Sequence, residues 1–160
     1  SSRNARGMTV PFNTLHDMDF FVGFPPSAGS VIVRNNIFSA KKGTSCSAMV
    51  LEKSITHDYN LFSSSTYNPG GESNPVIGSP LFVTIGSLFA LLTGSPAINK
   101  GNPTEEAAFA AYQSRYGVDI RRDLAGVRRP QQSRWDIGAY EFGSGTPVVS
   151  PNPPSNLRVN

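Results

Sequence analysis

The chain has 160 residues, a net charge of +3 and only 16% charged residues, with 15 Gly and 13 Pro. This length is sufficient for one domain with a buried core. A composition this rich in Gly and Pro favours a turn-rich β protein over a helical one. The single Cys46 excludes an internal disulfide, and no stretch approaches the roughly 18–20 apolar residues of a membrane span.

The excess positive charge is concentrated between Arg115 and Arg134, where six Arg occur. Such a cluster can bind nucleic acid or an acidic polysaccharide. Carboxylates in the same region offer ion-pair partners instead, so we expect a structural role for this cluster and no nucleic-acid partner. These carboxylates are Asp119, Asp123, Asp136 and Glu141.

A repeat occupies the first part of the chain. An Asn followed two positions later by Leu or Phe recurs at Asn13, Asn36 and Asn60, which are 23 and 24 residues apart. We expect each repeat to form one coil, with parallel strands stacked about 4.8 Å apart on those of the next coil. The residues expected to stack are Met8/Val31/Ile55, Val10/Val33/His57 and Leu15/Phe38/Phe62.

The three Asn would then lie above one another at a corner of the coil. Asn tolerates a left-handed backbone, and its amide can both donate and accept hydrogen bonds. The spacing therefore predicts a ladder through Asn13, Asn36 and Asn60. His57 occupies an otherwise apolar position, and we interpret it as a partly buried, hydrogen-bonded His; the alternative is a site residue. Residues 63–78 are interpreted as an excursion from the coils.

The pattern changes after Gly101. The string Asn102-Pro103-Thr104-Glu105 is typical of a helix start, with Asn as the N-cap, and Gly117 is typical of a helix end. We expect a helix over about 103–116 that lies across the open end of the coils and protects their strand edges. Its expected apolar stripe is Ala108, Phe109, Tyr112 and Tyr116.

Two strings resemble the closing segment of bacterial right-handed parallel β-helix proteins, the pectin-lyase-like group. They are Gly94-Ser95-Pro96-Ala97-Ile98-Asn99-Lys100-Gly101 and Trp135-Asp136-Ile137-Gly138-Ala139-Tyr140-Glu141-Phe142. The string Ser79-Pro80-Leu81-Phe82-Val83 looks like the start of a last strand. The resemblance covers about residues 8–142, although Ser79 and Asn99 stand where the group commonly has Asp. The residues between the two strings that match the group's spacing are Asp119, Asp123, Gly126, Arg128 and Pro130.

This resemblance implies an all-β fold, a right-handed parallel β-helix of about three to four coils with a short capping helix. Residues 1–142 would form the coils and cap, and 143–160 a Pro-rich linker. Within the cap, we expect a shielded ion pair from Arg128 to Asp136 or Glu141. The linker string 153–159 resembles the first strand of a fibronectin type III domain, so further domains of the same polypeptide are expected. We interpret the chain, which begins without Met, as a fragment or a processed product.

The group includes polysaccharide lyases, epimerases and glycosidases, so the resemblance implies a secreted or cell-surface bacterial protein associated with carbohydrate. For this chain we expect a mainly structural role, with a polysaccharide as partner and no membrane span. One alternative is part of a polysaccharide lyase or glycosidase whose catalytic residues lie mostly upstream. A second alternative is a piece that self-associates through an open N-terminal edge.

No catalytic motif is present in the sequence, and catalytic residues stay unassigned. Arg34, Lys41 and Asp58 are the candidates for substrate binding, because they are expected to face outward near the coil corners. Asp17 and Asp19 would point the same way on a strand, which could serve a metal. We expect no cofactor, except that Ca²⁺ would suit these carboxylates.

Overall fold

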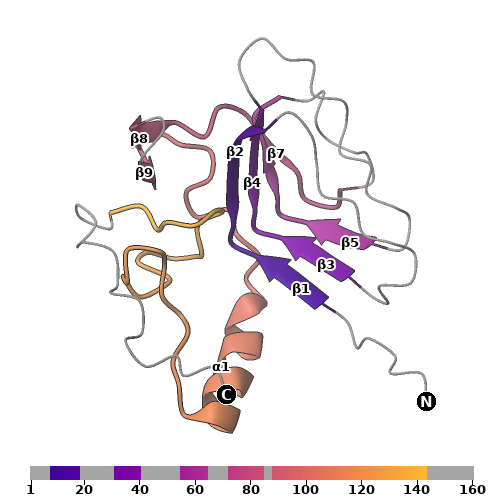
Figure 1. Ribbon diagram of the computed structural model, residues 1–160, viewed down its shortest axis with the longest axis vertical. Coiled ribbons are helices and arrows are strands. Elements are labelled where there is room, and N and C mark those ends of the chain that lie inside the picture. Colours follow the sequence, from indigo (N-terminus) through magenta and orange to yellow (C-terminus); the bar gives the residue numbers. More distant parts are fainter. Residues whose placement is uncertain (1–7, 19–30, 41–54, 65–71, 85–87, 144–160) are drawn as a thin grey trace, which may run out of the picture.

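The computed structural model describes residues 8–18, 31–40, 55–64, 72–84 and 88–143 (Figure 1). Strands in parallel sheets predominate, and α1 (Glu105–Tyr116) is the single helix of these stretches. That helix is too short to cross a membrane. The strands are β1 (Met8–Pro11), β2 (Thr14–Met18), β3 (Val31–Arg34), β4 (Ile37–Ala40), β5 (Ile55–Asp58), β6 (Leu61–Phe62), β7 (Val76–Ile77), β8 (Phe82–Thr84) and β9 (Leu88–Leu91).

The first sheet takes one strand from each repeat, in the order β1-β3-β5. All its pairs are parallel, with Met8 beside Val31 and Val31 beside Ile55. This register is the one that the repeat predicts. The second predicted stack is aligned in the same way: Val10, Val33 and His57.

The second sheet has the order β2-β4-β6-β7 and is also parallel up to β7. Leu15 pairs with Phe38 and Phe38 with Phe62, as predicted, and the two Phe rings stack with centroids 5.5 Å apart. β7 adds a fourth strand beside β6, so the prediction of an excursion over 63–78 was wrong at Val76–Ile77. We call the β1/β2, β3/β4 and β5/β6 pairs the first, second and third rungs.

A left-handed residue turns the chain between the two strands of each rung. Phe12, Asn35 and Tyr59 have φ of 55°, 58° and 54°. Each stands one position before the ladder Asn, so the prediction that the Asn itself takes this backbone was wrong. The Asn instead reaches back over the turn: Nδ2 of Asn36 donates to the carbonyl of Arg34 at 2.9 Å. This hydrogen bond requires the Asn to follow the turn.

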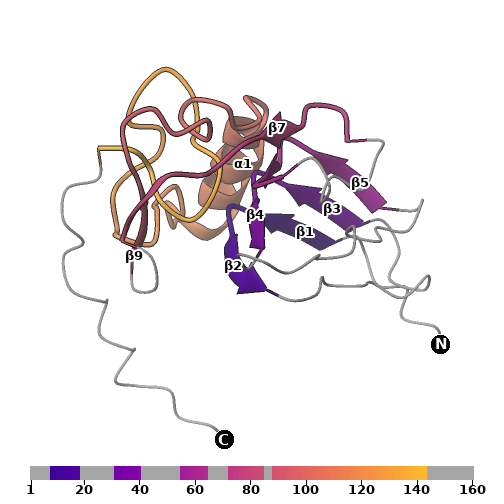
Figure 2. The same cartoon turned by 90° about the horizontal axis from the view of Figure 1, so that it is seen from above.

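Residues 94–143, which we call the C-terminal segment, pack along the flank of the rungs rather than across their end (Figure 2). Ala139 N donates to Thr14 Oγ1 in the first rung at 3.1 Å. Gly138 N donates to the carbonyl of Asn35 in the second rung at 2.8 Å. The predicted covering of the open end was therefore wrong.

Burial explains this placement. The second sheet is apolar on both faces, with Phe38 and Phe62 on one and Ile37 and Leu61 on the other, and all four are buried. Ile37 and Leu61 share a core cluster with residues from the second half of the chain. Because this face would otherwise expose large apolar side chains, it is the surface that the C-terminal segment covers. The other buried members of the cluster are Phe82, Leu91, Ala97 and Ile137.

The string that begins at Ser79 forms an antiparallel hairpin. The predicted strand is present but begins only at Phe82, and it pairs antiparallel with β9, so its expected place in a last parallel coil was wrong. Phe82 and Phe89 pack on the ring of His16, at 5.5 and 5.3 Å between centroids. The hairpin thus extends the cover of the second sheet.

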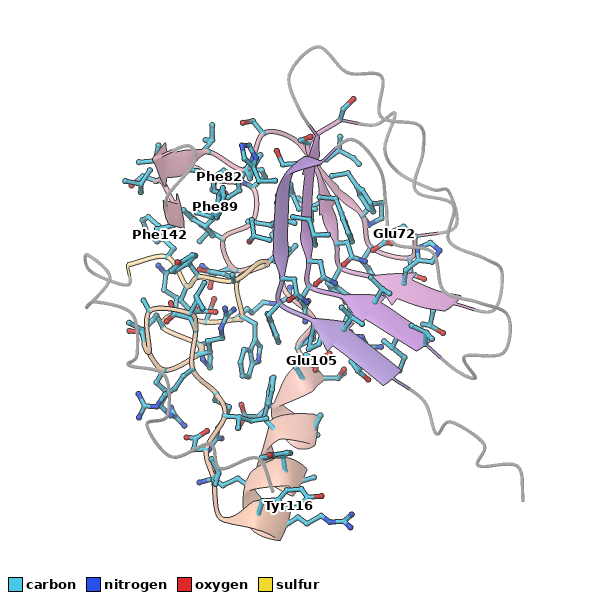
Figure 3. All side chains as sticks on the ribbon, in the orientation of Figure 1. Glu72, Phe82, Phe89, Glu105, Tyr116 and Phe142 are labelled. Carbon is cyan, nitrogen blue, oxygen red and sulfur yellow. The ribbon has the colours of Figure 1, made fainter. Side chains whose placement is uncertain are left out.

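The helix α1 ends at Gly117, whose φ of 70° confirms the predicted terminator. It begins at Glu105 with Thr104 as the N-cap, about two residues later than expected, because Asn102 Oδ1 accepts hydrogen bonds from Thr104 N and Oγ1 in a turn before the helix. The predicted apolar stripe was wrong: Tyr116 is 55% exposed, and Phe109 provides the ring that reaches the core. Figure 3 shows Glu105 where α1 meets the first sheet and Tyr116 at the far end.

The contact between Gly138 and the second rung gives a first prediction. Gly138 has a φ of +100°, and a Cβ there would lie 2.5 Å from Cδ1 of Ile37. Gly138→Ala should therefore lower the free energy of unfolding by about 2–5 kcal/mol, measured by chemical denaturation. Gly126→Ala is the control, because Gly126 also has a positive φ but no atom within 4 Å of the added Cβ. Equal losses in the two variants would contradict the close packing.

Candidate functional site

A ladder of hydrogen bonds connects successive rungs at the corner between the sheets. The backbone N and Nδ2 of Asn13 both donate to Oδ1 of Asn36, at 2.9 and 3.0 Å. Those of Asn36 donate to Oδ1 of Asn60, at 3.0 and 3.1 Å. Those of Asn60 donate to Oε1 of Glu72, at 2.9 and 3.0 Å. Every step therefore runs in the same direction along the chain.

The ladder ends on a buried carboxylate. The side chain of Glu72 has no exposed surface, and its Oε2 lies 2.5 Å from Nδ1 of His57. Burial raises the pKa of Glu72, although the hydrogen bonds from Asn60 and His57 oppose this effect. His57 is thus a partly buried, hydrogen-bonded residue of the last rung, in agreement with the interpretation from the sequence.

The other end of the ladder is open. Both donors of Asn13 are used, because Nδ2 also donates to the carbonyl of Pro11 at 3.0 Å. Its Oδ1 receives no hydrogen bond from any residue that the structure describes. This oxygen occupies the position that accepts two hydrogen bonds in Asn36 and Asn60.

Two of the three predicted substrate-binding residues lie together. Arg34 and Asp58 are register partners in the first sheet, with Nε and Oδ1 3.2 Å apart. Nη1 of Arg34 also pairs with Oε1 of Glu105 at 3.1 Å, and Nδ2 of Asn102 donates to Asp58. These contacts tie α1 to the sheet, and substrate binding by Arg34 and Asp58 stays a prediction. Lys41 lies outside the described residues.

The predicted metal site falls almost entirely outside the described residues. Asp17 belongs to β2, but its side chain is not among those described, and Asp19 lies beyond the strand. Within the described stretches, no group of three or more His, Cys, Asp or Glu is arranged to hold a metal ion. Calcium binding by Asp17 and Asp19 stays a prediction.

The shielded ion pair of the C-terminal segment uses Arg129, so the prediction of Arg128 was wrong. Arg129 is buried, and its Nη1 and Nη2 donate to Glu141 Oε1 and to the carbonyl of Gly138, at 3.3 and 2.9 Å. Arg128 is 57% exposed, with Nε 3.8 Å from Asp119. Neighbouring residues of an extended chain point to opposite sides, which places one Arg inside and the next outside.

Asp136 and Glu141 accept hydrogen bonds from the backbone of their own segment. Asp136 Oδ1 accepts from Asn99 N at 2.6 Å, and Oδ2 from Phe142 N at 2.5 Å. Glu141 Oε2 accepts from Gln131 N at 3.2 Å. Burial raises the pKa of both carboxyls and lowers that of the Arg129 guanidinium. All four carboxylate oxygens of Asp136 and Glu141 accept hydrogen bonds from within the C-terminal segment, so we interpret this pair as structural.

Several grooves of the described residues lie beside the rungs, and two of them bear on function. The first, which we call the edge groove, has a volume of about 480 Å³ and lies between the open first rung and the C-terminal segment. The second, the basic groove, has about 420 Å³ and carries Lys100 and Arg134 opposite Tyr59. The edge-groove residues used below are Phe12, Asn13, Thr14, Phe109, Ile120 and Leu124.

Sequence reasoning missed Glu72 and Glu105. Glu72 follows Asn60 by 12 residues rather than by a full repeat, so the spacing that identifies the Asn does not identify it. Glu105 stands in a helix start, where acidic residues are common without any partner. The sequence did indicate a buried arginine in this stretch: it predicted Arg128 as the partner of Glu141, and the structure places the adjacent Arg129 there.

The chain was compared with family models, with curated proteins and with solved structures, and none of them matches it.

The correction from Arg128 to Arg129 gives a second prediction. Arg129→Ala would leave Glu141 buried without its cation and should cost about 3–5 kcal/mol of unfolding free energy, measured by urea denaturation. Arg128→Ala is the matched control and should cost less than about 1 kcal/mol, because that ion pair is exposed. A larger loss in the Arg128 variant would overturn the assignment.

Proposed function

We propose that this chain forms the last rungs of a right-handed parallel β-helix, together with the segment that fastens them, and that its role is structural. The parallel register of one strand pair per repeat supports this proposal. Parallel strands joined by crossover connections are nearly always right-handed. The buried ion pair of Arg129 and Glu141 would serve as the fastening.

The observation that carries the proposal is the direction of the ladder. Asn36 and Asn60 each accept from the ladder residue before them and donate to the one after them, so an Asn at this position can be followed by a further ladder residue. Glu72 only accepts when ionised, and its second oxygen is already engaged by His57. A carboxylate at this position therefore suits the end of a ladder.

The setting that we propose is a secreted or cell-surface bacterial protein associated with polysaccharide. This part of the proposal rests on the resemblance of the strings at 94–101 and 135–142 to the pectin-lyase-like group. Lyase or glycosidase activity with catalytic residues in other coils is the alternative. In this chain Arg34 is already paired with Asp58 and Glu105, and Asp58 with Arg34 and Asn102.

The basic groove favours a second function, binding of an acidic polysaccharide. Lys100 and Arg134 have no carboxylate partner among the described residues, and no acceptor there reaches the buried Nε of Arg134. Nη2 of Arg134 donates to the carbonyl of Gly101 at 3.0 Å, which fixes the guanidinium at the groove. The ring of Tyr59 offers a flat face of the kind on which sugars stack. A uronate carboxylate beside these two cations would suit this site.

The proposal that Glu72 ends the ladder can be tested by measuring the stability of Glu72 variants. Glu72→Ala leaves the backbone N–H of Asn60 and one of its two Nδ2 hydrogens buried without an acceptor, while the other keeps the carbonyl of Val33; the loss should cost about 2–4 kcal/mol in chemical denaturation. Glu72→Gln keeps one oxygen and should cost less. Asn13→Ala is the control at the open end and should cost about 1 kcal/mol or less. If Glu72→Ala costs no more than Asn13→Ala, a terminating role for Glu72 is excluded.

The basic groove can be tested with polygalacturonate as the probe. We expect salt-sensitive binding that falls at least about fivefold in Arg134→Ala, the loss of roughly 1 kcal/mol. Arg128→Ala removes an exposed charge elsewhere and should leave binding unchanged. Equal binding by all three proteins would exclude the groove. Release of unsaturated uronate, followed by ultraviolet absorbance with and without Ca²⁺, would favour the lyase alternative.

A further inference from the structure

We propose that the edge groove is the seat of one more rung of the same strand–Asn–strand pattern, joined to the amino-terminal side of β1. This inference rests on the proposed function and names the partner of the open end. The incoming rung would pair in parallel with β1 and β2, each of which lies at the edge of its sheet. Its Asn would stand above Asn13 and donate to it.

The first support is the open acceptor of Asn13. In the rungs below, Oδ1 of Asn36 and of Asn60 each receive one backbone N–H and one Nδ2 hydrogen bond. Oδ1 of Asn13 has the same place in the ladder and receives none from the described residues. A further Asn about one strand spacing away would supply both donors.

The direction of the ladder distinguishes this partner from a second copy of the chain. Two copies that met through their first rungs would bring two Asn13 oxygens together, because the donors of Asn13 are already used. Contact with the last rung of another copy would oppose Asn13 to the carboxylate of Glu72. Neither arrangement provides a donor, whereas a preceding Asn rung does.

The second support is the lining of the groove. Residues that turn the corner face the C-terminal segment: the ring of Phe12 lies 5.4 Å from that of Trp135, and Asn35 Oδ1 accepts from Asn102 N. The corner residue of an added rung would take the next position in this column and enter the edge groove. Leu124 is 62% exposed there and Ile120 40%, so an apolar corner would cover both.

A tandem copy of residues 1–23 placed before Ser1 tests the proposal in the full chain. The Asn of the copy then stands 23 residues before Asn13, the spacing of Asn13 and Asn36. We expect the melting temperature to rise by about 3 °C or more. The matched control carries Asp in place of that Asn, which removes the amide donor and opposes a carboxylate to Oδ1 of Asn13. This control should show no rise.

Leu124→Lys provides a second readout. In the 160-residue chain this substitution should leave the melting temperature nearly unchanged, because Leu124 is exposed. In the extended protein, where the added rung would cover Leu124, the same substitution should lower the melting temperature by several degrees. The proposed seat is overturned if the extension does not raise the melting temperature, or if the Asp control raises it equally. A stable dimer of the 160-residue chain in light scattering would also overturn it. These outcomes are independent of the Glu72 variants, so the seat can fail while the terminating role of Glu72 stands.

Discussion

The directional ladder from Asn13 to Glu72 is the constraint on which the arrangement of the rungs depends. Because each Asn donates twice to the next side chain, neighbouring rungs can align in one register only. That register stacks Phe38 on Phe62 and leaves Ile37 and Leu61 on the opposite face. The doubly apolar second sheet, and hence the need for a covering segment, follows from it.

Much of this arrangement could be predicted from the repeat. The pairing of Val31 with Ile55 and of Leu15 with Phe38 follows from residue spacing, because each stacked position needs an apolar side chain and such side chains therefore recur at the repeat length. The position of the left-handed residue could not be predicted in this way. Asn tolerates that backbone, yet in this corner its amide is needed one position later, and Phe12 and Tyr59 take the unfavourable φ.

The features that could not be predicted from the sequence depend on contacts between residues that are far apart in the chain. Glu72 has no place in the repeat and becomes a ladder residue only because the chain after β6 returns to the corner. Arg128 and Arg129 are neighbours in an irregular stretch, and only Arg129 is buried. A repeat pattern would show which of the two points inward, but this stretch has none. The helix could be located from its ends, but its position along the flank depended on which face of the second sheet needed cover.

The placement of the C-terminal segment also affects how the rungs unfold. In a stack where each rung touches only its neighbours, terminal rungs can open one at a time, and stability is a sum of nearest-neighbour terms. Here one segment contacts Thr14, Asn35 and Asp58 in three successive rungs. Opening the first rung therefore loosens the segment that also holds the second and third. We expect these rungs to unfold together rather than to fray one at a time from the end.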